Sequence, residues 1–171
     1  MERQVSRMGG NIITLLGKTP NLGDMAPDFA LRDSDLLQVT LATYAGKVKL
    51  LSVVPSIETT VCDQQTKRLS KETAGMSEDL VVASVSMDLP FALKRWTTSC
   101  KVKNVIMLSD YMDSSFGMAY GVLIKELKLL NRSIFIVDRQ DTLQYVEIVD
   151  ENDNHPNYER ALAALARILK K

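Results

Sequence analysis

Residues 48–69 read VKLLSVVPSIETTVCDQQTKRL, an apolar run joined to a polar run by a short loop. The β-branched and aliphatic side chains from Val48 to Val54 predict a buried strand. The residues from Asp63 to Met76 are polar and carry apolar side chains only at intervals, which predicts a helix with one exposed side. A strand that leads directly into a helix is typical of an α/β layer structure.

The same alternation of strand and helix patterns recurs along the rest of the chain. Short aliphatic runs predict further strands at Leu80 to Val85, Asn104 to Leu108, Ser133 to Val137 and Leu143 to Val149. Helical patterns at Asp63 to Met76 and at Pro90 to Lys101 separate most of them, and another helical pattern follows the last strand at Tyr158 to Lys171. The last two strands are joined by the short connection Arg139 to Thr142, which indicates an antiparallel hairpin. The sequence therefore predicts an α/β fold with a mixed central β-sheet flanked by α-helices.

The length and composition are ordinary for one globular domain. The chain has 171 residues, of which 46% are hydrophobic and 25% are charged. These values fit one domain with a single sizeable core, and no internal repeat or long linker divides the sequence. We expect a single domain over residues 11–171, preceded by a disordered leader over residues 1–10.

The charge balance and the apolar runs exclude two classes of partner. Lysine and arginine together number 21, as do aspartate and glutamate, so the net charge is zero. No overall field draws the protein to nucleic acid or to an anionic membrane. The longest apolar runs are far shorter than the roughly 20 residues of a membrane-spanning helix. We therefore expect neither a nucleic acid nor a membrane as partner, and a cytoplasmic location.

The two cysteines and the one histidine are too few for a disulfide scaffold or a zinc site. We expect no metal ion and no other cofactor. The histidine, His155, stands beside Pro156 in a polar stretch, which favours a solvated loop residue over a catalytic one.

Cys62 follows the loop after the first predicted strand, and this position places it in the first turn of the following helix. Free backbone N–H groups and the positive end of the helix dipole favour a thiolate there, and a thiolate is a nucleophile. Thr59 lies close enough in a tight turn to hydrogen-bond the sulfur or a substrate oxygen bound beside it, and Pro55 fixes the chain as it leaves the strand. The alternative is a small buried cysteine with only a packing role.

Pro55, Thr59 and Cys62 together fill the pattern Pro-x-x-x-Thr-x-x-Cys, through which the sequence resembles the peroxiredoxins. Further stretches resemble the bacterial thiol peroxidase branch of the atypical two-cysteine peroxiredoxins. They are Leu51 to Ile57, Val85 to Ala92, Met107 to Tyr111, Ser115 to Gly117, Leu129 to Asp138 and Tyr145 to Glu147. The resemblance extends from about residue 23 to the C-terminus.

This resemblance implies a thioredoxin-like fold and a thiol-dependent peroxidase that reduces hydrogen peroxide and organic hydroperoxides. Cys62 would attack the hydroperoxide, and a thioredoxin-type reductant would recycle the enzyme. Arg132 would be the active-site arginine, whose guanidinium stabilises the thiolate and polarises the peroxide; the alternative is a surface arginine beside a strand. The resemblance also implies a homodimer, which the apolar residues Met112, Phe116 and Tyr120 in loop sequence would support if they are exposed. The alternative is that these side chains lie in the core.

The sequence departs from the pattern of this branch in three places. Glu58 stands where the branch usually has Asp. The segment Ile12 to Gly23 is short for the N-terminal hairpin of the branch, so the opening strands are expected to be curtailed. The third departure concerns the resolving cysteine, which typically follows an Arg-aromatic pair directly, whereas here Thr97 takes that position and Cys100 follows later. Cys100 is our candidate resolving cysteine, and the alternative is an inert Cys100 with a one-cysteine mechanism.

Two other functions are compatible with a reactive cysteine. Disulfide exchange occurs on thioredoxin-like folds, but it is typical of a Cys-x-x-Cys motif, which Cys62 does not begin. A peroxide-sensing redox protein would keep the same cysteine and relay its oxidation to a partner. Sequence alone does not separate such a sensor from a peroxidase.

Overall fold

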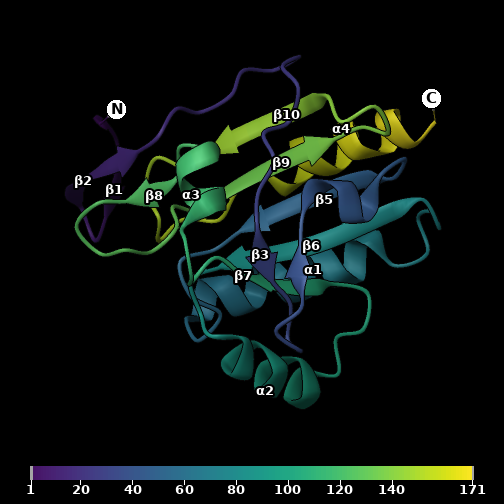
Figure 1. Ribbon diagram of the computed structural model, residues 1–171, viewed down its shortest axis with the longest axis horizontal. Helices are drawn as coiled ribbons and strands as arrows, with labels where there is room; N and C mark the ends of the chain where they lie inside the picture. The colour runs from purple at the N-terminus through teal and green to yellow at the C-terminus, as the bar shows by residue number, and fades with distance from the viewer. Residues whose placement is uncertain (1, 171) are drawn as a thin grey trace.

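A seven-stranded sheet forms the centre of the computed structural model, which describes the backbone of residues 2–170 and the side chains of residues 6–170 (Figure 1). The strand order is β10-β9-β5-β6-β7-β3-β4. In chain order the strands are β3 (Leu31–Arg32), β4 (Gln38–Val39), β5 (Val48–Val53), β6 (Leu80–Ser86), β7 (Ile106–Ser109), β9 (Ser133–Val137) and β10 (Leu143–Ile148).

The sheet is mixed, as predicted. Strands β5, β6 and β7 are parallel, whereas β9 runs antiparallel to β5 and β10 runs antiparallel to β9. The parallel strands are connected by α1 (Thr60–Thr73) and α2 (Pro90–Cys100). Helix α1 begins at Thr60 rather than at the expected Asp63, so Cys62 lies in its first turn. Because α1 directly follows β5, the chain leaves the sheet at the carboxyl edge of the parallel strands.

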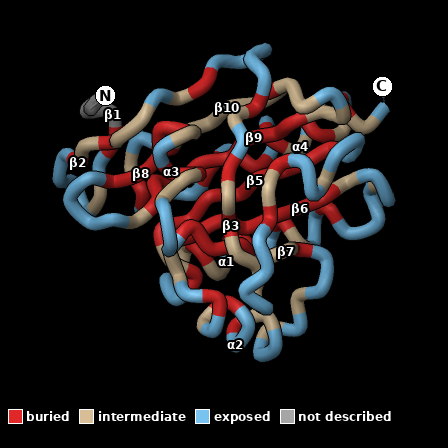
Figure 2. Tube along the Cα trace, viewed as in Figure 1, coloured by how far each residue is buried: buried red, intermediate tan, exposed pale blue. Residues whose placement is uncertain are grey.

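One face of the sheet packs against α1, α2 and α4 (Tyr158–Leu169) (Figure 1). The last helix buries an apolar stripe that includes Ala161, Leu165 and Ile168. These helices share one core cluster with inward-facing strand residues, as the buried centre of the trace shows (Figure 2). Among the members from the strands and from the other two helices are Val48, Leu50, Val82, Met107, Ile134, Ile136, Leu69, Leu93 and Trp96.

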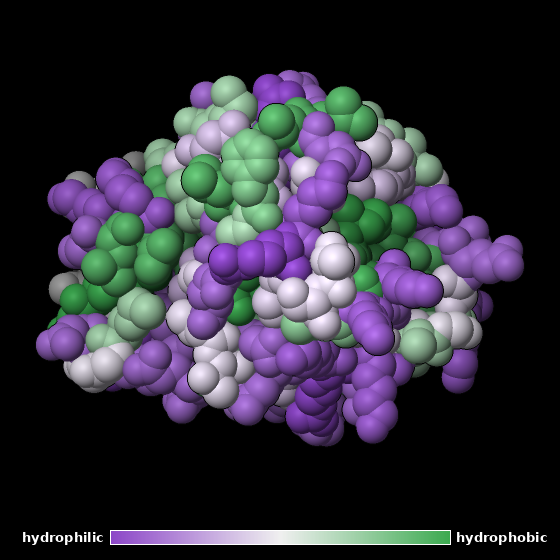
Figure 3. All heavy atoms as spheres, turned by 90° about the horizontal axis from the view of Figure 1, so that it is seen from below, coloured by the Kyte–Doolittle hydropathy of each residue, from purple (hydrophilic) through white to green (hydrophobic). Residues whose placement is uncertain are grey.

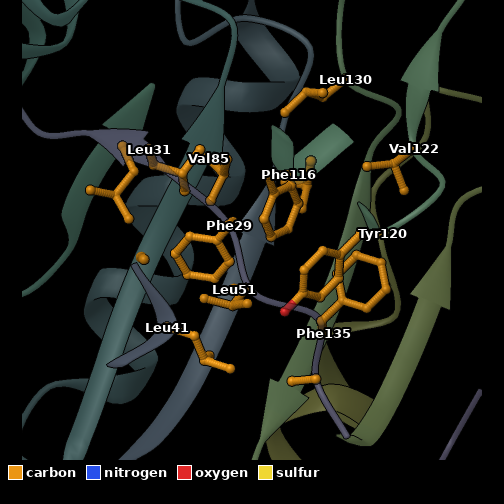
Figure 4. Packing of buried hydrophobic residues seen from close by; sticks show 14 of the residues in the cluster. Phe29, Leu31, Leu41, Leu51, Val85, Phe116, Tyr120, Val122, Leu130 and Phe135 are labelled. Atoms are coloured by element: carbon orange, nitrogen blue, oxygen red, sulfur yellow. The ribbon is translucent and has the colours of Figure 1, made fainter. Parts of the chain in front are cut away.

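The opposite face carries an aromatic cluster between the sheet, the short helix α3 (Ser115–Ala119) and the 3-10 helix η1 (Leu41–Tyr44) (Figure 4). Phe116 and Tyr120 stack with their ring centroids 4.1 Å apart, and Phe135 meets Tyr120 edge-on. Both stacked rings are fully buried. Of the two interpretations of Phe116 and Tyr120, exposed loop residues or core residues, the second is confirmed, because both side chains pack against the sheet. Met112, in contrast, is exposed.

The N-terminal residues form a hairpin rather than the expected disordered leader. Strand β1 (Glu2–Met8) pairs with β2 (Asn11–Leu16), which pairs with β8 (Leu123–Ile124) in a second, three-stranded sheet. Gly9 and Gly10 form the turn with φ angles of 56° and 76°, the conformation that a two-residue hairpin loop requires. The predictions of disorder and of curtailed opening strands are thus wrong from residue 2 onward; Met1 lies outside the described residues.

The hairpin went unpredicted because β1 has no alternating apolar pattern and depends on main-chain contacts with a distant loop. Ser6 Oγ donates to the Val149 carbonyl at 3.0 Å, and Arg7 N donates to the Asp150 carbonyl at 2.6 Å. In return, Asn152 N donates to the Arg7 carbonyl at 2.8 Å. The hairpin is therefore fastened to the loop that follows β10.

Candidate active site

Cys62 is placed by the loop that joins the end of β5 to the start of α1. Pro55 is buried at the beginning of this loop, and Cys62, in the first turn of the helix, is fully buried. The first N–H groups of a helix have no partner within the helix, so the sulfur lies in a region of positive potential. Local sequence is enough to produce this arrangement, since it needs only a strand, a short loop and a helix.

Thr59 directs its side chain to the sulfur. It is the N-cap residue of α1, but its hydroxyl makes no capping hydrogen bond to the helix. Instead, Thr59 Oγ1 lies 2.7 Å from Cys62 Sγ and 3.0 Å from the carbonyl oxygen of Ser56. A hydroxyl has one proton, so it can donate to only one of these acceptors at a time. Thr59 can thus donate to a thiolate, or release it and interact with a bound oxygen.

Arg132 reaches the same sulfur from a different part of the chain. It precedes β9, whose first residue, Ser133, pairs with Val53 at the end of β5. This antiparallel register brings the start of β9 next to the loop that carries Cys62. Arg132 Nη2 lies 3.5 Å from Cys62 Sγ, and the side chain is only 2% exposed. The structure therefore brings Thr59, Cys62 and Arg132 together.

Two residues that the sequence did not single out hold the guanidinium of Arg132. Its Nη1 donates to Gln65 Oε1 at 2.8 Å, and its Nε donates to the carbonyl oxygen of Asn152 at 2.8 Å. Gln65 is in turn fixed by its donor bond to Ser52 Oγ, at 2.8 Å. Gln65 follows Cys62 at helical spacing, so the two share one side of α1, and this spacing was the available signal. No comparable signal existed for Asn152.

Asp88 fixes the loop before the cysteine, and it too was missed. Its carboxylate accepts from Ser56 Oγ and from Ile57 N, each at 2.7 Å, and from Ser86 Oγ at 2.8 Å. Parallel strands β5 and β6 end at the same edge of the sheet, which is why Asp88 meets this loop. Glu58, the residue that departs from the family pattern, forms an ion pair with Arg95 of α2.

His155 is an exposed loop residue, as predicted, and its hydrogen bond goes to Tyr158. Burial lowers the pKa of His155, and the positive charges of Arg132 and Arg68 lower it further. Burial raises the pKa of Tyr158 to about 12. The lowered pKa favours the uncharged imidazole, whose Nδ1 shares a hydrogen bond with the Tyr158 hydroxyl across 2.7 Å. An uncharged His155 adds no second positive charge near Arg132.

Cys100 is the last residue of α2 and lies beside α1. It is half-buried, and its sulfur is 4.0 Å from Asp63 Oδ1, which also accepts from Trp96 Nε1 at 2.9 Å. Both cysteines are free thiols. Thr97, at the usual family position, donates its hydroxyl to the Leu93 carbonyl within the same helix. Cys100 thus approaches the residue that directly follows Cys62, without being bonded to Cys62.

The arrangement is suited to nucleophilic chemistry by sulfur. A thiolate at Cys62 would face a hydroxyl donor and a guanidinium, and these groups can orient a polar substrate and stabilise negative charge on it. Over residues 6–170, no group of three or more His, Cys, Asp and Glu side chains is placed to hold a metal ion. In the described part of the chain, no helix has the length and apolar character needed to cross a membrane.

Comparison with known proteins gives consistent matches over nearly the whole chain. A model of the Redoxin family matches residues 21–162. A protein named thiol peroxidase from Staphylococcus aureus (strain MRSA252) is 52% identical over 159 residues, which are 93% of this chain and 96% of the relative. A thiol peroxidase from Listeria innocua serovar 6a is 48% identical over 154 residues, which are 90% and 93% of the two chains.

Solved structures agree with these sequence matches. The crystal structure of a peroxiredoxin-like protein from Aquifex aeolicus superposes with a TM-score of 0.90 at 34% identity, covering 98% of both chains. A thiol peroxidase from Chromobacterium violaceum gives a TM-score of 0.87 over 96% of this chain and 97% of its own. At 19% identity, this second likeness concerns the fold alone.

Proposed function

This chain belongs to the Redoxin family and is a thiol-dependent peroxidase, and from that premise we propose that Cys62 is its peroxidatic nucleophile. One observation carries the assignment: Cys62 Sγ lies in the first turn of α1, 2.7 Å from the Thr59 hydroxyl and 3.5 Å from the Arg132 guanidinium. Cys100 has no such pair of donors beside it among its described contacts.

The first step is attack of the Cys62 thiolate on the terminal oxygen of a hydroperoxide. A sulfur–oxygen bond forms, the O–O bond breaks, and the second oxygen leaves as hydroxide or alkoxide. It takes up the proton that the Cys62 thiol released on ionisation, which gives water or an alcohol. Thr59 and Arg132 hold the peroxide and stabilise the negative charge that develops on the leaving oxygen. Pro55 supports the loop and helps exclude water. Cys62 remains as a sulfenic acid.

In the second step, the Cys100 thiol condenses with the sulfenic acid and releases water, forming a Cys62–Cys100 disulfide. A disulfide needs Cα atoms within about 7 Å, so the buried first turn of α1 must unwind to release Cys62. The end of α2 must unwind as well, and Cys100 is the last residue of that helix, followed by Lys101 with a φ of 56°. The contact of Cys100 with Asp63, the residue after Cys62, supports this role.

Peptide mapping after one equivalent of hydrogen peroxide tests both assignments. We expect a disulfide-linked pair of peptides that contain Cys62 and Cys100. In the Cys100→Ser variant, we expect a sulfenic acid on Cys62 that dimedone traps, because the condensing thiol is absent.

Two results would contradict these assignments, one for Cys100 and one for Cys62. A dimedone adduct on Cys62 in the unaltered protein, beside an unmodified Cys100 and with full reductant-coupled turnover of Cys100→Ser, would replace the resolving role by a one-cysteine route. A sulfenic acid found on Cys100 instead would show that Cys62 is not the nucleophile.

The oxidised enzyme is recycled by an external dithiol of the thioredoxin type, which reduces the disulfide by thiol exchange. We place the protein in the cytoplasm, where such dithiols are kept reduced. Both cysteines are free thiols, which suits that compartment.

The protein forms a homodimer through the carboxyl edge of the sheet. Leu89 and Phe91 follow β6 and are 51% and 67% exposed, and Met112, after the neighbouring strand β7, is 52% exposed. On the face seen from below in Figure 3, hydrophobic atoms form separate patches among hydrophilic ones. Exposed apolar side chains at one edge support contact with a second copy.

Light scattering at micromolar concentration is expected to give the mass of two chains. Phe91→Asp, which puts a charge on this edge, is expected to shift the protein toward the monomer, whereas Leu22→Asp on a separate loop is not. A monomeric mass for the unaltered protein would contradict the dimer.

A further inference from the structure

Asn152 is a fully buried residue in the loop after β10, and it contacts Arg132 at two points. Its Oδ1 accepts a hydrogen bond from the Arg132 main-chain N at 2.7 Å. Its carbonyl oxygen accepts from Arg132 Nε at 2.8 Å. The two bonds thus hold both the backbone and the guanidinium end of one arginine.

The Arg132 guanidinium has little freedom to reorient once these bonds are made. Its Nε is held by Asn152 and its Nη1 by Gln65, so the planar group can only direct Nη2 toward Cys62 Sγ, 3.5 Å away. A guanidinium is rigid and its donors lie in one plane, so fixing two of them fixes the third. The direction of the donor at the sulfur therefore depends on Asn152.

Asn152 is itself anchored by groups far away in the sequence. Its Nδ2 donates to Asn131 Oδ1 at 2.5 Å and to the Arg7 carbonyl at 3.3 Å. Its main-chain N donates to the same carbonyl at 2.8 Å. Strand β1 therefore holds the loop residue that holds the arginine.

We propose that Asn152 is a positioning residue for the peroxidase reaction: it sets the orientation of the Arg132 guanidinium at Cys62 and ties that orientation to the N-terminal hairpin. This inference rests on the proposed role of Arg132. Replacing Asn152 with Ala removes the side-chain acceptor for the Arg132 main-chain N and the Nδ2 bonds to Asn131 and to the Arg7 carbonyl. The main-chain carbonyl that accepts from Arg132 Nε remains, but the loop that carries it is less firmly held. The guanidinium is then directed less strictly toward Cys62, although its charge is unchanged.

The test is the second-order rate constant for oxidation of Cys62 by hydrogen peroxide in the full chain, measured in a single turnover. Asn152→Ala is expected to lower this rate constant by about 10- to 100-fold, the range that small misplacement of a catalytic group costs. Asn154→Ala makes the same substitution at an exposed position of the same loop, and is expected to keep the rate of the unaltered protein.

A double-mutant cycle with Arg132→Lys separates positioning from general destabilisation. Lysine keeps the charge but lacks the planar fork that Asn152 orients, so Asn152→Ala is expected to have less than about a twofold further effect in the Arg132→Lys background. The effect of Asn152→Ala on thermal stability, in contrast, is expected in both backgrounds. All rates are measured below the unfolding transition of each variant.

Equal rate losses in the two backgrounds, or no loss for Asn152→Ala, would overturn the positioning role. If Arg132→Lys alone reacted with peroxide as fast as the unaltered protein, the proposed function of Arg132 would fail as well. Should Asn152→Ala not fold, Asn152→Ser takes its place in the cycle, because its hydroxyl can bind a water in the space left by the amide. Equal rate losses in the two backgrounds, or no loss for Asn152→Ser, would then overturn the positioning role.

Discussion

The Cys62→Ser variant is expected to lose peroxide reduction, with a fall in turnover of more than about 10⁴-fold, to the uncatalysed background. Serine is nearly isosteric with cysteine, but its hydroxyl is not appreciably ionised at neutral pH and is a poor nucleophile toward a peroxide. The Thr59 hydroxyl and the Arg132 guanidinium remain in place to hydrogen-bond the new oxygen. The fold should therefore survive, as circular dichroism and thermal unfolding would report.

Cys100→Ser is the matched control, since it makes the same chemical change in the other cysteine. It is expected to leave the first, peroxide-consuming step unchanged in a single turnover and to impair only the recycling that follows. If Cys62→Ser retained most of its reductant-coupled peroxidase rate, Cys62 would not be the nucleophile.

Arg132→Ala is expected to slow the oxidation of Cys62 by peroxide by about 10² to 10³-fold, the usual cost of removing one donor to a developing negative charge. The substitution also removes a positive charge beside the sulfur nucleophile, so Cys62 is expected to react more slowly with an alkylating reagent as well. Stopped-flow oxidation measures the first effect, and the rate of Cys62 alkylation measures the second.

Arg132→Lys and Arg167→Ala serve as controls. Lysine restores a positive charge but not the fork that donates to both Gln65 and the sulfur, so it should recover alkylation more fully than peroxide oxidation. Arg167 is exposed in the last turn of α4, and its removal should change neither rate. If Arg132→Ala behaved like Arg167→Ala, the guanidinium near Cys62 would have no part in the reaction.

Much of the fold follows from local sequence patterns. The strand over Ser133–Val137 has the predicted bounds, and those at Leu80 and Leu143 begin where predicted. The mixed sheet, the thioredoxin-like fold, the family and the peroxidase activity are all confirmed. These features depend on hydrophobic periodicity and on an extended resemblance, both of which a single sequence displays.

Other features depend on contacts between distant residues, and local patterns do not report them. Phe116 and Tyr120 look like loop residues in the sequence, but they are fully buried because the sheet packs against them. Strand β1 of the N-terminal hairpin lacks apolar alternation and is held by main-chain bonds to residues after β10. Gly9 and Gly10 form the turn of this hairpin, but a pair of glycines alone does not predict a hairpin without those bonds.

The site around Cys62 shows which features local sequence determines and which depend on the tertiary structure. A strand, a loop and a helix that follow one another in sequence were sufficient to place Cys62 in a first turn, because that geometry is local. Arg132 is 70 residues away along the chain, and Asn152 is a further 20 residues beyond it. Only the pairing of β9 with β5 and the anchoring of the last loop by β1 bring their donors and acceptors to one sulfur, because hydrogen bonds require a specific direction that sequence spacing over such distances does not encode.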